Sequence, residues 1–255
     1  MTGWEQVAVF FGGMAAGAVN TIVGAGSLIT FPLLLAIGYP PVIANVSNTV
    51  GLIPGSVSGA FGYRRELEGQ RPRLLRLCAA GGLGGLSGGL ILLAMPEAVF
   101  EGVVPFLIAL ACVLVLLQPA VARRLENRTS AREGLARPDV GVGLLAGVYL
   151  AGIYGGYFGA AQGVLLLGLL GIGLNEHLQR VNAAKNVIAA TVNTVPAVLF
   201  VLVADVSWQV ALLLGAGSVI GGQVGAKVGR RMPAGVLRAA VLAVGIVAIV
   251  RILAG

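Results

Sequence analysis

The sequence predicts an all-α protein that spans a membrane several times, and three observations lead to this prediction. Hydrophobic residues make up 57% of the 255-residue chain and charged residues 11%, against about 45–50% and about 25% in soluble domains. Glycine contributes 40 residues, and small residues favour close helix packing in membranes. Apolar runs of about 20 residues, the length that crosses the hydrocarbon core, recur along the chain. We therefore expect a lipid bilayer to surround the protein.

Six of these runs are long enough to cross as single helices, and two longer regions are interrupted. The expected spans are residues 42–62, 74–94, 98–121, 182–204, 206–226 and 234–253. Regions 5–37 and 140–174 are broken by glycines, and the pieces that follow the breaks, 27–37 and 162–174, are too short to span. We interpret each region as a hairpin in which one helix enters, an irregular turn lies at membrane depth and a short helix returns. Such a turn is tolerated only where it lines a polar cavity or is buried in protein.

The two halves of the chain carry the same pattern. The break Gly24-Ala25-Gly26-Ser27 is matched 135 residues later by Gly159-Ala160-Ala161-Gln162, and Met95-Pro96 recurs as Met232-Pro233. We predict two inverted-topology repeats, each a broken-helix hairpin plus three transmembrane helices. The first repeat covers residues 1–121, a cytoplasmic linker covers 122–138, and the second, inverted repeat covers 139–255. Interrupted helices in corresponding positions of two halves indicate the substrate site of a secondary transporter.

The basic residues predict the orientation. Fifteen of the 17 lie in or beside four stretches, at 63–76, 122–138, 180–185 and 227–231. The opposite connections, 38–41, 96–101 and 205–208, carry none. Because Lys and Arg favour cytoplasmic loops, all four stretches are expected in the cytoplasm, which requires each broken region to return to its starting side. Both termini are then extracytoplasmic in a multi-pass cell-membrane protein, and no basic face is left for nucleic acid.

Polar side chains of the predicted membrane segments gather at equivalent places of both halves. The short helices begin just after the breaks, and unsatisfied N–H groups at helix N-termini favour anions. Asn45-x-x-Asn48-Thr49 and Asn182-x-x-Lys185-Asn186 place polar groups on one helix face. Tyr154 is a candidate gate. The predicted substrate-binding residues are Asn20, Thr21, Gly24, Gly26, Ser27, Asn45, Asn48, Thr49, Tyr154, Gln162, Gly163, Asn182, Lys185 and Asn186.

Each of these features also has a purely structural interpretation. The glycine runs can serve packing alone, and Asn45 and Asn182 can cap helices. Lys185 can extend to the cytoplasmic interface instead of the cavity. Two glycine ladders indicate helix packing within the chain, with a homodimer interface as the alternative; they are Gly81/Gly85/Gly89 and Gly217/Gly221/Gly225/Gly229.

Several kinds of chemistry have no basis in this sequence. Within the expected spans the only Asp or Glu is Glu101, near the start of 98–121, which leaves no carboxylate relay for cations or protons. There is no His/Cys/carboxylate cluster, no nucleotide-binding loop and no Ser-His-Asp arrangement. Neither an enzyme nor a bound metal or cofactor is expected. Cys78 and Cys112 lie in apolar helical sequence and are expected to be free thiols.

Five motifs carry a resemblance to a known family. They are NTIVGAGSLITFPLLLAIGYPP at 20–41, ANVSNTVGLIPG at 44–55, GYRREL at 62–67, GGYFGAAQGVLLL at 155–167 and NAAKN at 182–186. With these motifs in this order, the chain resembles the TauE/SafE family of sulfite and organosulfonate exporters. The resemblance implies export of a small sulfur oxyanion, either sulfite or an organosulfonate such as sulfoacetate, by alternating access between the hairpin tips. An anion channel, a transporter of another small organic anion and a non-transporting membrane assembly or sensor subunit stay open as alternatives.

Overall fold

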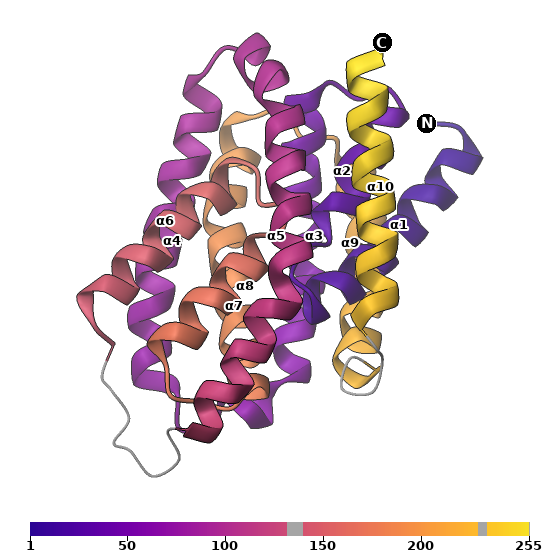
Figure 1. The fold of residues 1–255 in the computed structure, drawn as a ribbon. Coiled ribbons are helices and arrows are strands. Elements are labelled where there is room, and N and C mark those ends of the chain that lie inside the picture. Colours follow the sequence, from indigo (N-terminus) through magenta and orange to yellow (C-terminus); the bar gives the residue numbers. More distant parts are fainter. Residues whose placement is uncertain (132–139, 229–233, 255) are drawn as a thin grey trace.

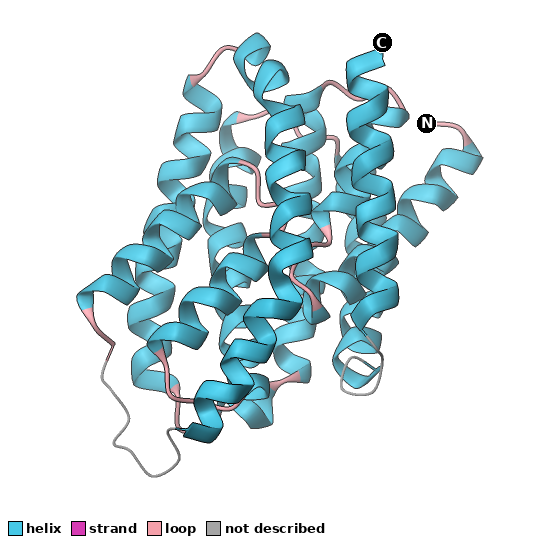
Figure 2. Ribbon diagram, viewed as in Figure 1, coloured by secondary structure: helices cyan, strands magenta, loops and turns pink. Residues whose placement is uncertain are grey.

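The computed structural model describes residues 1–131, 140–228 and 234–254, and these residues are almost entirely helical. Figure 2 shows helices joined by short connections, with no strand in the described ranges. The elements are α1 (Gly3–Ile22), α2 (Ser27–Ala36), α3 (Pro41–Gly62), the 3-10 helix η1 (Arg64–Leu67), α4 (Arg71–Ala94), α5 (Glu97–Ala131), α6 (Val142–Tyr157), α7 (Gln162–Gly173), α8 (Leu178–Val203), α9 (Trp208–Val228) and α10 (Ala234–Ala254). The predicted all-α class is confirmed.

Among the described residues, four helices are long and apolar enough to cross a bilayer, which agrees with a polytopic membrane protein. They are α4, α5 over Glu97–Arg124, α8 and α9 over Trp208–Lys227. Helix α3 has 22 residues, about 33 Å at 1.5 Å per residue, but polar side chains interrupt its apolar sequence. Its polar side chains Asn45, Ser47 and Asn48 are buried inside the bundle. They therefore do not contact lipid, where a polar side chain would be energetically costly.

Both predicted helix breaks are present. Helix α1 ends at Ile22 and α2 begins at Ser27, while α6 ends at Tyr157 and α7 begins at Gln162. With 10 and 12 residues, α2 and α7 reach about 15 and 18 Å, too short for a core of about 30 Å. Figure 1 shows both breaks at mid-height in the bundle, away from its two ends.

Glycine makes these breaks possible. Gly24 and Gly159 both lie in the left-handed region, at φ of +84° and +78°, which glycine adopts without a steric penalty. In the second break Ala161 also has a positive φ, of 59°, at a cost of about 1–2 kcal/mol for a residue with a Cβ. Gly24 and Gly159 are also the positions that match each other when the two halves of the chain are compared.

The helices pack in pairs that link the two halves of the chain. Helix α9 packs on α1 and α3, while α4 packs on α6 and α8. Helices α3 and α8 contact each other in the interior. Helices α5 and α10 pack on each other, and they also contact α7 and α2 respectively. Every helix of one half therefore has a neighbour in the other half.

The glycine ladders serve this packing within the chain. A Cβ at Gly85 would lie 2.5 Å from the carbonyl oxygen of Val192 on α8, and one at Gly221 would overlap the carbonyl oxygen of Met14 on α1. These contacts favour the first of the two interpretations, packing within the monomer. Gly229, the last position of the second ladder, lies outside the described residues.

The described parts of the stretches at 63–76 and 122–138 lie at one end of the bundle, and both termini lie near the other end (Figure 1). Arg180 is tied to the same end through Glu176 and Arg73, whereas Lys185 of the third stretch is buried inside the bundle. The linker predicted at 122–138 begins as a continuation of α5. Helix α5 continues to Ala131 because residues 120–131 contain no glycine or proline and half of them are Ala or Arg, which favour helix. The remainder of the linker, with Arg132 and Arg137, lies outside the described residues, as do Arg230, Arg231 and Met232-Pro233.

Candidate functional site

A small polar cavity lies where the two breaks meet the interior helices α3 and α8. Its volume is about 10 Å³, about the space that one water molecule needs. The lining residues are Asn20, Thr21, Gly24, Ser56, Gly163, Lys185, Asn186 and Ala189. Six of these eight are residues that the sequence predicted for substrate binding, and they come from both halves of the chain.

The two breaks touch each other directly at Gly24 and Gly163. The backbone N–H of Gly163 donates a hydrogen bond to the carbonyl oxygen of Gly24 at 3.1 Å. A Cβ on Gly24 would lie 2.5 Å from the Cα of Gly163, and a Cβ on Gly163 would overlap the Cα of Gly24. No side chain larger than hydrogen fits at either position without moving backbone, so these two glycines are required by the contact.

Lys185 is the cation of this cavity. Its side chain is 1% exposed, so the alternative in which it extends to the interface is wrong. The Nζ atom donates to the carbonyl oxygens of Asn20 and Thr21 at 3.4 and 3.3 Å. These carbonyls belong to the C-terminal turn of α1, where the helix dipole is negative. Among the described residues no carboxylate forms an ion pair with Lys185.

Amide side chains gather around the same end of α1. Asn186 and Asn182 donate through their Nδ2 atoms to the carbonyl oxygen of Thr21, at 3.3 and 3.5 Å. The Nδ2 atom of Asn20 donates to Ser56 Oγ at 3.3 Å. Helix α8 therefore holds the end of α1 through three side chains, which fixes the position of the first break.

Polar residues of α3 contact the helices on either side of the breaks. Asn45 donates through Nδ2 to the carbonyl oxygen of Tyr157 at 2.9 Å, at the end of α6. Asn48 is 1% exposed and accepts a hydrogen bond from Thr30 on α2. The hydroxyl of Thr49 returns to the carbonyl oxygen of Asn45 in its own helix. These three predicted residues lie beside the breaks but do not line the cavity.

Four further predicted residues also lie outside the cavity lining. A Cβ on Gly26 would overlap the carbonyl oxygen of Ala16, so this glycine serves the packing of the first break on α1. Ser27 is half-buried at the start of α2. The hydroxyl of Tyr154 donates to the carbonyl oxygen of Ala160 at 2.6 Å and braces the second break. Gln162 is buried beside Gly155.

Three buried polar atoms near the breaks have no hydrogen-bond partner among the described residues. They are Asn45 Oδ1, Asn182 Oδ1 and Gln162 Nε2. Buried polar groups are almost always satisfied in native proteins, and exceptions indicate a water, an ion or a functional site. All three belong to the set that the sequence predicted, which supports polar chemistry at this place over simple helix capping.

Sequence reasoning missed Ser56 and Thr30. Ser56 follows Asn45 by 11 residues and Thr49 by seven, and both spacings return to the same face of a helix. Extending the polar pattern of α3 by two turns would therefore have found it. Thr30 has no comparable signal, because its pairing with Asn48 depends on how α2 folds back against α3.

The two ends of the bundle are held by different kinds of contact. At the basic end the buried carboxylate of Glu176 pairs with Arg73 at 2.8 Å and with Arg180 at 2.6 Å. Burial alone raises the pKa of Glu176, but hydrogen bonds from the two arginines outweigh this and hold it below its ordinary value. At the opposite end the backbone N–H of Ser207 donates to Ser47 Oγ at 2.9 Å.

Other chemistry has no counterpart in the described residues. No group of three or more His, Cys, Asp or Glu side chains is placed to hold a metal ion there. Cys78 and Cys112 are free, as predicted.

A polar cavity with a buried cation, enclosed between two broken helices of a helical membrane bundle, is the arrangement of a membrane transporter. Comparison with known proteins agrees. The family model described as sulfite exporter TauE/SafE matches residues 9–252. The chain belongs to this family and is a transporter rather than an enzyme.

Similar proteins from other organisms are described as probable membrane transporters. A "Probable membrane transporter protein" of Haemophilus influenzae is 29% identical over 226 residues, 88% of this chain and 86% of that protein. "Probable membrane transporter protein ORF9" of Sinorhizobium sp is 28% identical over 253 residues, 96% and 91% of the two chains. "Probable membrane transporter protein YfcA" of Escherichia coli K12 is 28% identical over 220 residues, 86% and 78%. No solved structure matches the chain.

Proposed function

We propose that this protein exports a small sulfur oxyanion, either sulfite or an organosulfonate such as sulfoacetate, and that the anion binds beside Lys185 between the two helix breaks. The observation that carries the proposal is a buried ammonium group that forms no ion pair with a carboxylate among the described residues. A buried charge is costly unless it is paired, and a bound oxyanion supplies the missing charge. An ammonium group has three donors, and two are directed at the carbonyls of Asn20 and Thr21.

The surrounding amides suit an oxyanion with several acceptor oxygens. Asn20, Asn182 and Asn186 present N–H donors that now bond to oxygens of the protein, at 3.3–3.5 Å. These hydrogen bonds are long compared with the usual 2.9–3.0 Å, so an anion that reaches them can replace the present acceptors. The other predicted residues lie next to the cavity and support the breaks. They are Gly26, Ser27, Asn45, Asn48, Thr49, Tyr154 and Gln162.

Substrate entry requires the two breaks to separate. A cavity of about 10 Å³ holds one water at most, and sulfite has four non-hydrogen atoms. The present conformation is therefore closed around the site, with the ion pairs of Glu176 at the basic end and the bond between Ser207 and Ser47 at the other. Alternating access follows if these two sets of contacts open in turn. A closed cavity also disfavours the alternative of an open anion channel, which single-channel currents would reveal.

Two inverted repeats provide the mechanism for such opening, and the packing supports them. If α1–α5 correspond to α6–α10, the pair α1 with α9 becomes α6 with α4, and α3 with α9 becomes α8 with α4; all four pairs are in contact. The donation from Asn45 to the end of α6 likewise corresponds to the donation from Asn182 to the end of α1. Rocking one repeat against the other around a fixed site is the usual movement of such folds.

The direction of transport follows from the charge of the substrate. We place the basic end in the cytoplasm of the cell membrane, with both termini outside, from the bias of Lys and Arg toward cytoplasmic loops. At about 100 mV, inside negative, moving one negative charge outward gains about 2.3 kcal/mol, equivalent to a roughly fifty-fold gradient. Export then needs no coupling ion, in line with the lack of a carboxylate in the cavity lining.

Calorimetric titration of the purified protein with sulfite, sulfoacetate, taurine, sulfate and chloride tests the proposal. We expect selective binding of sulfite or a sulfonate, weakened about 10- to 100-fold by Lys185→Ala, because losing a hydrogen bond to a charged group costs about 1.5–3 kcal/mol. Lys227→Ala, which removes an exposed lysine at the basic end, is the control and should bind as the wild type. Equal weak binding of all five anions, or the same affinity in both variants, would overturn the assignment of substrate and site.

A further inference from the structure

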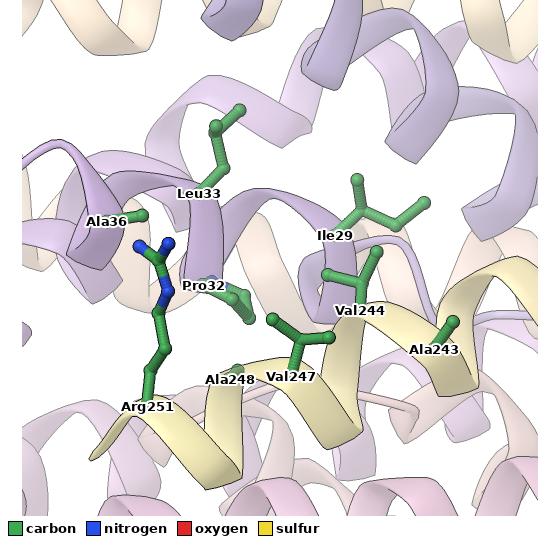
Figure 3. Close-up of a pocket in the computed structure, with 9 residues that line it drawn as sticks. All are labelled: Ile29, Pro32, Leu33, Ala36, Ala243, Val244, Val247, Ala248 and Arg251. Atoms are coloured by element: carbon green, nitrogen blue, oxygen red, sulfur yellow. The ribbon is translucent and has the colours of Figure 1, made fainter. Parts of the chain in front are cut away.

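A second cavity lies away from the candidate site, in a groove between α2 and α10 (Figure 3). Its volume is about 410 Å³, within the range of about 300–1,000 Å³ that small-molecule sites occupy. Apart from one arginine its lining is apolar, and it consists of Ile29, Pro32, Leu33, Ala36, Ala243, Val244, Val247 and Ala248. None of these residues lines the cavity around Lys185.

The groove opens toward the surroundings of the bundle. Helix α10 packs on α5 and α2, and its apolar side chains Ile246, Val247 and Val250 are more than half exposed, at 57, 58 and 59%. In a membrane these side chains face hydrocarbon. A lipid acyl chain is therefore the apolar group that reaches this groove.

One charged side chain lies at the end of the groove. Figure 3 shows Arg251 extending from α10 toward Ala36 on α2, so that its guanidinium group crosses the space between the two helices. The adjoining space, of about 280 Å³, is lined by Arg251 together with Leu35 and Ile252. Arg251 forms no hydrogen bond or ion pair with any described residue. Arg251 lies in the last turn of α10, where a positive charge interacts favourably with the helix dipole. The dipole does not explain why its side chain extends toward α2.

The other half of the chain has no such residue. Helix α5 occupies the place that corresponds to α10 in the proposed repeats, and residues 98–122 of the chain include no Lys or Arg. Packing of the fifth helix therefore does not need a basic residue at this level. The arginine is a feature of the α2–α10 groove alone, which indicates a ligand at this groove rather than a requirement of the fold.

We propose that the groove binds an anionic phospholipid, with an acyl chain along the apolar side chains of α2 and α10 and the phosphate of the headgroup on Arg251. Guanidinium groups bind phosphate through two parallel hydrogen bonds. Near a bilayer surface one basic residue favours anionic lipid by about 1 kcal/mol, or about fivefold. The lipid lies in the leaflet at the end of the bundle that holds both termini (Figure 1).

Native mass spectrometry of the purified protein, titrated with dioleoyl phosphatidylglycerol or dioleoyl phosphatidylcholine, tests this site. We expect the wild type to bind phosphatidylglycerol about fivefold more tightly, and Arg251→Leu to bind both lipids equally. Arg124→Leu, which removes an exposed arginine at the basic end, is the matched control and should keep the preference. Ala243→Phe, which places a ring in the exposed part of the groove, should weaken binding of both lipids.

Each contrary result overturns the proposal in its own way. An unchanged preference in Arg251→Leu, in a variant with wild-type thermal stability, would remove the arginine from the site. Binding of glycerol 3-phosphate as tight as that of the lipid would show a phosphate site without an acyl chain. A dimer that persists without lipid and is lost in Ala243→Phe would show a second copy of the chain in the groove. None of these readouts depends on the anion that the protein transports.

Discussion

Gly163→Ala tests whether the contact between the two breaks holds the site together. A methyl group at this position would overlap the Cα of Gly24 and lie 3.0 Å from its carbonyl oxygen, whereas carbon atoms in contact lie about 3.5–4.0 Å apart. Because both neighbours are backbone atoms, the breaks must move apart by about 1 Å. This movement lengthens the hydrogen bond from Gly163 N to Gly24 O from 3.1 Å beyond the useful range.

The expected loss of stability follows from these two effects. Overpacking costs about 1–3 kcal/mol and a lost hydrogen bond about 1 kcal/mol, so Gly163→Ala should destabilise the protein by about 2–4 kcal/mol. Since 1 kcal/mol shifts Tm by about 2–4 °C in a chain of this size, thermal unfolding in detergent should show a decrease of about 4–16 °C.

Gly168→Ala provides the control in the same helix. Its Cβ would meet Val121 at 3.6 Å, an ordinary contact, and alanine favours helix over glycine by about 1 kcal/mol. Its Tm should therefore equal or slightly exceed that of the wild type. If Gly163→Ala and Gly168→Ala unfold within about 2 °C of each other, less than the shift worked out above, the contact between the breaks does not carry the stability assigned to it.

Two further substitutions test the packing and the basic end. Glu176→Gln should destabilise the protein by up to about 3 kcal/mol, because it removes the charge that both arginines share. The pKa of the carboxyl group is held below its ordinary 4.5, so its contribution is complete above pH 4.5 and is lost as the pH falls below that value, through the lowered pKa. The difference in Tm between wild type and variant should shrink in acid, and a difference that grows on acidification would contradict this. Gly221→Ala should push α9 away from α1 and destabilise the protein by about 1–3 kcal/mol. Gly215→Ala is the control and should be tolerated, because its Cβ would meet Gly51 and Pro54 at 3.6 Å. Equal Tm values for the two variants would show that the glycine ladder of α9 is not closely packed.

The helix breaks could be predicted from the sequence because their causes are local. Glycines at 24–26 and 159 interrupt apolar runs, and the pieces that follow are too short to cross a bilayer. The end of α5 was less predictable, since clustered arginines placed a linker from residue 122 and the helix continues into it as far as Ala131. Charge marks the side of a membrane at which a helix emerges, and it does not end the helix.

The partners of the site residues could not be predicted, because they depend on how distant segments meet. The sequence left Lys185 with two interpretations, and the choice depends on where the end of α1 lies relative to α8. Likewise, the spacing of Asn45 and Asn48 placed both on one face of α3, but one bonds to Tyr157 and the other to Thr30. The cavity is also more closed than the sequence suggested, since the N–H of Gly163 that was expected to face an anion bonds to Gly24.

The meeting of Gly24 and Gly163 also makes the site a joint product of the two halves. Asn20, Thr21, Gly24 and Ser56 come from the first half, and Gly163, Lys185, Asn186 and Ala189 come from the second. Neither half alone encloses the cavity: the first lacks its cation, and the second lacks the helix end that the cation holds. A substitution at this contact in one half therefore acts directly on the part of the site that the other half supplies.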